Sequence, residues 1–171
     1  MRVLPRLALP LLLLFAPVAL AQQQPARPRK LGDFQAWIAA TYAEGGQKVC
    51  YAFAKASRSE GASRQGVLLT VTHRVTGRDT VTMSAGYAYP RNAEVMATIS
   101  ANEMPFYTAG STAAARDGAA VVRAFRNGRD AVLRGPGANG RGTVTDSFSL
   151  AGFSQAYDAI SKECPPGATS R

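Results

Sequence analysis

The sequence predicts a mainly β protein, an antiparallel β-sandwich or open barrel with a short central helix and a C-terminal helix packed on the sheet. Residues 67–75 and 81–87 alternate apolar and polar side chains with a period of two, which indicates two antiparallel strands with one buried face. Residues 153–164 instead repeat their large apolar side chains at helical spacing, which indicates a closing helix.

The first 21 residues are predicted to be a signal peptide. Arg2 and Arg6 form a short basic region, residues 7–20 are apolar, and Ala19 and Ala21 supply the small residues that signal peptidase accepts before a cleavage site. The apolar run of about 14 residues is shorter than the roughly 20 that a membrane span needs. We therefore expect an exported protein, located in the periplasm or at the outer membrane, with no transmembrane span in the mature chain.

The mature chain is predicted to hold one β-rich domain, residues 31–164. Residues 22–30, QQQPARPRK, form a flexible basic leader, and residues 165–171 form a disordered tail. The signal peptide carries two arginines and no acidic residue, so the mature protein keeps 18 basic and 11 acidic residues. This balance suggests anionic partners such as lipid headgroups or glycans, although scattered arginines also agree with no such partner.

Short strands separated by turn residues fill the domain. Hairpin turns are expected at Gly45-Gly46 and at Gly77-Arg78-Asp79, and residues 95–99 repeat the strand alternation. Residues 104–108 suggest a strand at a sheet edge because Pro105 has no N–H. Around the first hairpin, Phe34, Trp37 and Ile38 are expected to be buried, and Val49, Tyr51 and Phe53 share one face of the next strand.

Two helices are predicted, separated by strands at 131–133 and 143–148. Asp117 is the expected N-cap of the central helix and Gly128 its end. Ser149 is the expected cap of the closing helix. The apolar faces consist of Val121, Val122 and Phe125 in the central helix, and of Phe153, Tyr157, Ile160 and Cys164 in the closing helix.

The two cysteines, Cys50 and Cys164, are predicted to form one disulfide, because an exported chain meets an oxidising compartment. Their separation is not that of a catalytic Cys-x-x-Cys pair. One histidine and two paired cysteines cannot supply the three ligands of a His/Cys metal site. The histidine, His73, lies on the apolar face of a predicted strand, where a core or rim residue with one hydrogen bond is more typical than a catalyst.

No catalytic residue and no cofactor are predicted. The segment Gly135–Gly140 matches G-x-G-x-x-G, but a dinucleotide fold requires a helix after it, and residues 143–148 have the pattern of a strand. No nucleophile elbow accompanies the histidine. Nucleic-acid binding is disfavoured by the low density of basic residues and by export.

Five arginines in the C-terminal third are the candidate anion-binding residues. They form either one anion-binding face or an ordinary solvated helix surface with flanking loops. These residues are Arg123, Arg126, Arg129, Arg134 and Arg141.

Several segments of the mature chain resemble the invasion-associated locus B family of exported alphaproteobacterial proteins. They include KVCYA, LLTVTHR, AGYAYP, AAVVRAFRNG and, above all, RGTVTDSFSLAGFSQAYDAISKEC at the end. The resemblance implies a bridge between Cys50 and Cys164 and, for pathogenic members, a role in host-cell invasion. It brings no catalytic residues. Relatives often place a Trp before the central helix, where this chain has residues 111–115, STAAA.

These observations lead to two functional hypotheses. The first is an exported, non-enzymatic interaction protein of the envelope or cell surface. It binds a protein or an anionic component of the envelope or host surface and aids host-cell interaction. The alternative is a periplasmic binding module for an anionic small molecule, glycan or lipid, with or without enzymatic activity, whose pocket is lined by some of Arg123, Arg126, Arg134 and tyrosines.

Overall fold

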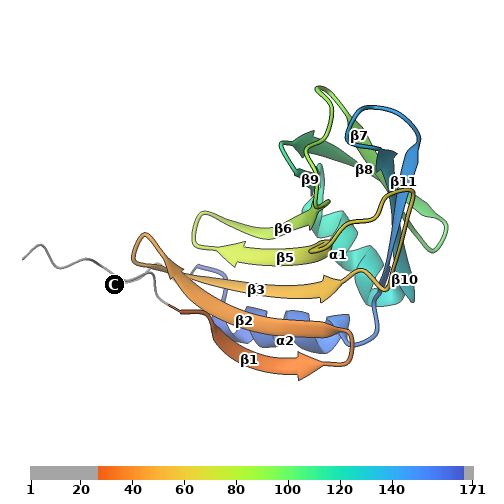
Figure 1. Cartoon of the computed structure of the whole chain (residues 1–171). Coiled ribbons are helices and arrows are strands. Elements are labelled where there is room, and N and C mark those ends of the chain that lie inside the picture. The colour runs from red at the N-terminus through yellow and green to blue at the C-terminus, as the bar shows by residue number, and fades with distance from the viewer. Residues whose placement is uncertain (1–26, 168–171) are drawn as a thin grey trace, which may run out of the picture.

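The computed structural model describes residues 27–167, which form eleven strands and two helices (Figure 1). The predicted signal peptide, residues 22–26 of the predicted leader and residues 168–171 of the predicted tail lie outside the described residues. The elements are β1 (Arg29–Phe34), β2 (Trp37–Glu44), β3 (Gln47–Lys55), β4 (Arg58–Glu60), β5 (Leu68–Arg74), β6 (Gly77–Ser84), β7 (Glu94–Ile99), β8 (Asn102–Ala109), β9 (Thr112–Ala115), α1 (Gly118–Asn127), β10 (Asp130–Pro136), β11 (Thr143–Ser149) and α2 (Phe153–Glu163).

All eleven strands belong to one antiparallel sheet with the order β1-β2-β3-β5-β6-β9-β8-β7-β10-β11-β4. The prediction of a mainly β, antiparallel fold with a central and a C-terminal helix is confirmed. The sheet does not close, because β1 and β4 are its two edges. It bends strongly, so that β7, β10 and β11 stand across β1, β2 and β3 as in a β-sandwich (Figure 1).

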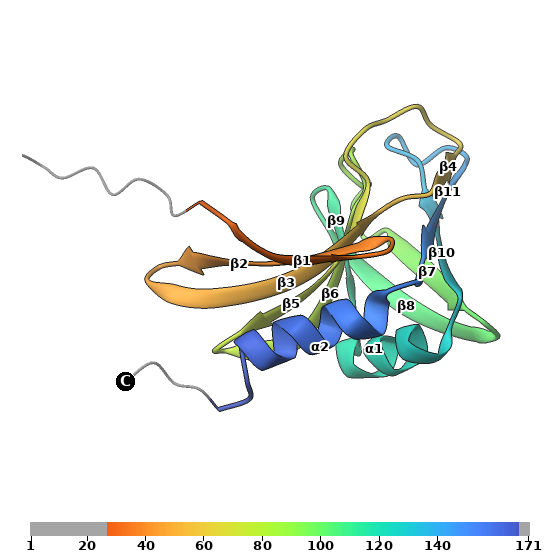
Figure 2. The ribbon, with the colours of Figure 1, turned by 90° about the horizontal axis from the view of Figure 1, so that it is seen from below.

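Both helices lie on the same face of the sheet and complete the core (Figure 2). Helix α2 contacts β1, β2, β3 and β5, while α1 contacts β6 and α2. Trp37 is fully buried, as predicted, with its ring 4.9 Å from that of Phe153 and 6.2 Å from that of Phe125. Its Nε1 donates a hydrogen bond of 3.0 Å to the carbonyl oxygen of Ser149. One aromatic side chain thus joins β2, both helices and the end of β11.

The hairpin of β5 and β6 turns earlier than predicted. Val75 and Thr76 form the turn, and Gly77 already pairs with Arg74 as the first residue of β6. Of the predicted turn residues, Arg78 and Asp79 instead form a β-bulge, because together they lie opposite the single residue His73. Asp79 takes a positive φ of 55° there. A bulge redirects the side chains of its strand, and this one places Arg78 and Asp79 beside α2.

Strand β8 is inside the sheet, between β9 and β7, so its predicted edge position is wrong. Pairing with β9 begins at Phe106, next to Pro105, and the Pro105 carbonyl accepts a hydrogen bond of 3.2 Å from the Arg116 N–H. The proline therefore lies beside the end of the β9 ladder, where a missing N–H is tolerated. The small side chains of Thr112–Ala115 form β9, in which Ala113 is fully buried.

The ends of the two helices are built differently. Asp117 caps α1 as predicted, accepting a 2.9 Å hydrogen bond from the Ala120 N–H. Gly128 ends α1 in extended backbone, and a Cβ there would lie 2.8 Å from a methyl group of Ile99. The predicted cap of α2 is wrong: the N-cap is Gly152, at φ 87°, rather than Ser149, which is the last residue of β11. Along the described part of the chain, neither helix has the length and hydropathy of a membrane span.

Two predictions about the first strands need correction. Strand β1 begins at Arg29, so Arg29 and Lys30 are strand residues rather than the end of a flexible leader. In β3, Tyr51 and Phe53 do share a face, but it is the face away from α2 and is only half-buried. The small residues that alternate with them point to the opposite face, towards the core and α2. These are Cys50, Ala52 and Ala54, each with no exposed surface.

Candidate functional site

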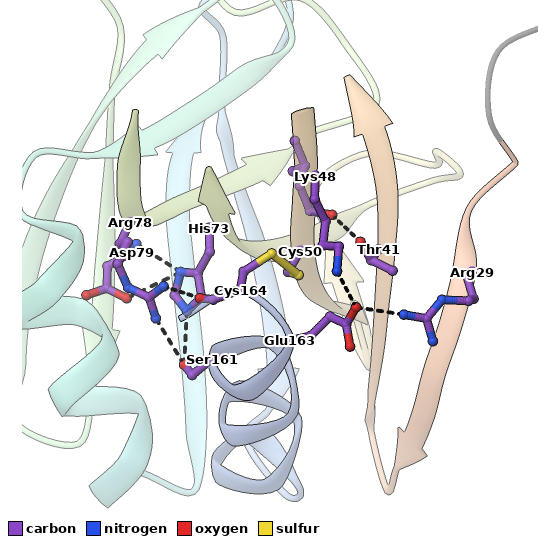
Figure 3. The surroundings of a disulfide bond; sticks show 11 residues. Arg29, Thr41, Lys48, Cys50, His73, Arg78, Asp79, Ser161, Glu163 and Cys164 are labelled. Atoms are coloured by element: carbon purple, nitrogen blue, oxygen red, sulfur yellow. Dashed lines mark hydrogen bonds and ion pairs between the residues drawn. A yellow bond between two sulfur atoms is a disulfide. The ribbon is translucent and has the colours of Figure 1, made fainter. Parts of the chain in front are cut away.

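The disulfide between Cys50 and Cys164 marks one end of the domain (Figure 3). It joins the middle of β3 to the residue that follows α2, across a Cα–Cα distance of 6.1 Å and 114 residues of sequence. The predicted pairing is thus present in the structure. The bond fixes the C-terminal end of α2 against β3 and β5, because Cys50 is also the β-sheet partner of His73.

His73 lies behind the disulfide with no exposed surface, which places it in the core. The Asp79 backbone N–H donates to its Nδ1 at 3.3 Å, so Nδ1 must be unprotonated. The proton is therefore on Nε2, which donates to the Ser161 hydroxyl at 3.1 Å. The ring also packs edge-on against Tyr157, at 5.1 Å. This neutral tautomer holds together β5, the bulge of β6 and α2.

Burial lowers the pKa of His73 from its ordinary value of 6.5 to about 4, since an imidazolium would lose its hydration. The nearby Arg78 charge lowers the pKa further, while Asp79 and the Thr72 backbone oppose the shift. Among residues 27–167, no titrating side chain is in hydrogen-bond contact with His73, and this arrangement suits a structural residue.

Acidification from pH 6.5 to 4 is expected to remove about 3 kcal/mol from the free energy of unfolding. In this interval the unfolded chain binds a proton at His73 and the folded protein does not, so stability is complete above pH 6.5 and falls towards pH 4. Urea unfolding at several pH values measures the slope. His73→Gln, which keeps a neutral donor, should flatten it, and an equally steep slope in that variant would contradict the assignment.

A cavity of about 410 Å³ adjoins the disulfide on its solvent side. We call it the disulfide-end cavity. It lies between the start of β3, the β5–β6 turn and the residues that follow α2. Its lining consists of Lys48, Arg74, Val75, Thr76, Gly77, Arg78, Glu163, Cys164, Pro165, Pro166 and Gly167.

Positive charge exceeds negative charge around the disulfide-end cavity. Lys48 and Arg29 share one carboxylate oxygen of Glu163, at 2.8 and 2.7 Å. The hydrogen bond from Lys48 is the main reason why the Glu163 pKa lies below its ordinary value, against partial burial. Arg74 pairs with Glu44 at 2.8 Å.

Arg78 is the cation of this cavity that has no acidic partner among residues 27–167. Its guanidinium donates to the carbonyl oxygen of Cys164 and, at 3.3 Å, to the Ser161 hydroxyl, both of which are neutral (Figure 3). Three cations, Lys48, Arg74 and Arg78, and one carboxylate, Glu163, line the disulfide-end cavity, which leaves an excess of two positive charges in its lining. Such a site favours an anionic group.

The five arginines predicted as anion-binding residues do not come together. Arg126 pairs with Asp158 at 2.5 Å and lies over the ring of Tyr157, whereas Arg123 is on the exposed side of α1 and Arg141 is in the loop between β10 and β11. Two of them, Arg129 and Arg134, line one concavity of about 500 Å³ on the outer face of β7 and β10. Its other lining residues are Thr98, Ser100, Asn127, Asp130 and Val132.

Sequence patterns did not identify the cations of the disulfide-end cavity as a group. Lys48, Arg74 and Arg78 are on three different strands, and Glu163 lies more than 80 residues beyond the last of them. The cysteines were the signal that could have identified these cations. Lys48 lies two residues before Cys50 in β3. Arg74 ends β5, the strand that pairs with β3, and Arg78 follows soon after it, so all three lie at the same end of the sheet.

The remaining chemical motifs have structural explanations. The segment from Gly135 to Gly140 runs from β10 into a loop that leads to β11, so a strand rather than a helix follows it. Within residues 27–167, no group of three or more His, Cys, Asp or Glu side chains is arranged to hold a metal ion.

A family model described as "Invasion associated locus B (IalB) protein" matches residues 37–161, which is well over half of the chain. Neither a curated protein nor a solved structure gives a significant match. The matched region contains Cys50, His73 and most of α2, whose packing defines the disulfide end of the domain. The chain therefore belongs to the invasion associated locus B family.

Proposed function

We propose that this protein is exported to the periplasm or outer membrane and works there, or at the cell surface, by binding rather than by catalysis. Its apolar N-terminal run, its disulfide and its family support this assignment. The family description also supports a role in host-cell interaction. In this proposal, the binding partner of the protein carries an anionic group, which docks in the disulfide-end cavity.

The observation that carries this proposal is the excess of positive charge around that cavity. Arg78 is oriented by the neutral groups of Cys164 and Ser161, and it forms no ion pair with a carboxylate of residues 27–167. The disulfide and the β-bulge hold this side chain in place, so an incoming anion meets a preorganised donor. Lys48 and Arg74 extend the positive surface on either side.

Binding to anionic surfaces should depend on this cavity. We expect the oxidised protein to bind at least one of lipopolysaccharide, anionic phospholipid vesicles and a sulfated glycan, with affinity that falls as salt rises. The double variant Lys48→Gln/Arg78→Gln should bind at least about tenfold more weakly, because charge-assisted contacts are lost. Surface plasmon resonance measures the dissociation constants.

The matched control is Arg123→Gln/Arg141→Gln, which removes the same charge from exposed positions away from the cavity. This control should bind nearly as well as the parent protein. Equal weakening in both double variants would show that only net charge matters and would contradict the proposal. Failure of all three surfaces to bind would contradict it as well.

A second candidate function is a binding module for an anionic small molecule at the concavity of Arg129 and Arg134. The observation that favours it is the shared lining of one concavity by these two arginines, neither of which forms an ion pair among residues 27–167. Asp130 in the same lining offsets part of their charge. In the same binding experiment, if Arg129→Gln/Arg134→Gln weakens binding and Lys48→Gln/Arg78→Gln does not, the binding site is this concavity rather than the disulfide-end cavity.

A further inference from the structure

We propose that the disulfide-end cavity binds one amphiphilic anion, an acyl chain that ends in a carboxylate or phosphate group. This inference rests on the proposed function and names the chemical class of its anionic group. The cavity joins two kinds of surface that separately would suit different ligands: an apolar wall and a cationic rim.

The apolar wall comes from the β5–β6 turn and from the residues after α2. Val75 is 42% exposed, one of three large hydrophobic side chains that residues 27–167 leave open to solvent, with Met96 and Tyr107. Val75 lines the cavity together with Pro165 and Pro166. Exposed apolar surface next to a concavity is a common feature of ligand sites. An acyl chain would cover this wall and remove it from water.

The cationic rim lies within the same cavity. Arg78 comes from the bulge two residues after the turn, and Lys48 comes from the start of β3. Glu163, which also lines the cavity, accepts from Lys48 and from Arg29, so the charge of Lys48 is already partly compensated. Arg78 has only neutral acceptors and is therefore the main site for the anionic head group.

The two surfaces together exclude simpler ligands. A small inorganic anion would satisfy Arg78 but would leave Val75 and the two prolines exposed. A neutral long-chain alcohol would cover the wall but would bring no charge to Arg78. The volume of about 410 Å³ is in the range of sites for small molecules, roughly 300–1,000 Å³. A single short or medium acyl chain with a charged head matches both surfaces.

Isothermal titration calorimetry of the oxidised protein tests the proposal, with ligands below the concentration at which they form micelles. We expect decanoate or decyl phosphate to bind, and decanol and acetate to bind at least tenfold more weakly. Decanoate points to a free fatty acid, and preference for decyl phosphate or a short-chain phosphatidylglycerol points to a lipid headgroup. Equal binding of decanol and the anions, or no binding of any anion, would overturn the proposal.

Variants connect the binding to the cavity. Arg78→Gln and Val75→Ser should each weaken decanoate binding about tenfold or more, while Arg141→Gln and Tyr107→Ser, their exposed counterparts elsewhere, should leave it unchanged. Because Arg78 also contacts Cys164, Lys48→Gln provides a second charge variant whose side chain does not contact the disulfide. Unchanged binding in Lys48→Gln, Arg78→Gln and Val75→Ser alike would place the ligand elsewhere.

The outcomes separate this inference from the proposed function. Cavity-dependent binding to a sulfated glycan without any decanoate or decyl phosphate binding would leave the proposed function intact and refute the amphiphile. Loss of both kinds of binding would refute both.

Discussion

Cys164→Ser is expected to lower the free energy of unfolding by about 4–5 kcal/mol. The bond closes a loop of 114 residues, so most of the domain lies within it, and breaking it restores that entropy to the unfolded chain. The native state also loses the attachment of α2 to β3, which fixes the disulfide-end cavity. Denaturant unfolding of the parent and the variant, both without reductant, measures the difference.

Two measurements control this result. The oxidised parent protein should contain no free thiol by thiol titration, since both cysteines are paired. The double variant Cys50→Ser/Cys164→Ser should lose about as much stability as the single variant, because either one removes the same bond. A loss below about 1 kcal/mol would show that the bridge does not constrain the unfolded chain as the loop-entropy model requires.

Asp146→Ala is expected to destabilise the protein by about 3–5 kcal/mol, because it leaves the charge of Arg64 buried without its partner. The pair joins β11 to the loop between β4 and β5 at 2.6 Å, with side-chain exposures of 2% for Asp146 and 4% for Arg64. Ser59 also donates to the Asp146 carboxylate, and Arg64 donates to the Ala85 carbonyl oxygen. Urea unfolding at neutral pH measures the loss.

Arg58→Ala is the matched control, because Arg58 forms an ion pair with Glu60 in the same region but is 75% exposed. Arg58→Ala should lower the free energy of unfolding by less than about 1 kcal/mol, as is usual when a surface ion pair is removed. Replacing both buried partners, in Arg64→Met/Asp146→Leu, should cost less than Asp146→Ala alone. A double variant that is less stable than Asp146→Ala would contradict the buried-charge explanation.

Local sequence patterns predicted the elements that depend on neighbouring residues. Asp117 caps α1 because its side chain reaches an N–H only three residues away. The alternation of Leu69 and Val71 placed the buried face of β5 correctly, because successive side chains of a strand point to opposite faces. Helical spacing likewise identified Phe153 and Ile160 as the buried face of α2.

Predictions failed where a distant strand decides the outcome. Pro105 suggested a sheet edge, yet β9 pairs with β8 and places it inside. Gly77-Arg78-Asp79 has the composition of a turn, but pairing with β5 joins Gly77 to Arg74 and makes Arg78 and Asp79 a bulge opposite His73. Among the candidate arginines, position in the sequence did not predict the ion-pair partner: Arg123 and Arg126 are three residues apart in α1, but Arg126 alone pairs with Asp158 of α2.

The sequence by itself determined the mainly β class, the two helices, the Cys50–Cys164 bridge and the family, because these follow from local periodicity and from the identity of a few residues. Only the tertiary structure decided where charge and apolar surface meet. The disulfide-end cavity joins Lys48, Val75, Arg78 and Pro165 from segments that are far apart in the chain. Their meeting depends on the order of the strands and on how α2 docks against them, and no local spacing of residues encodes either one.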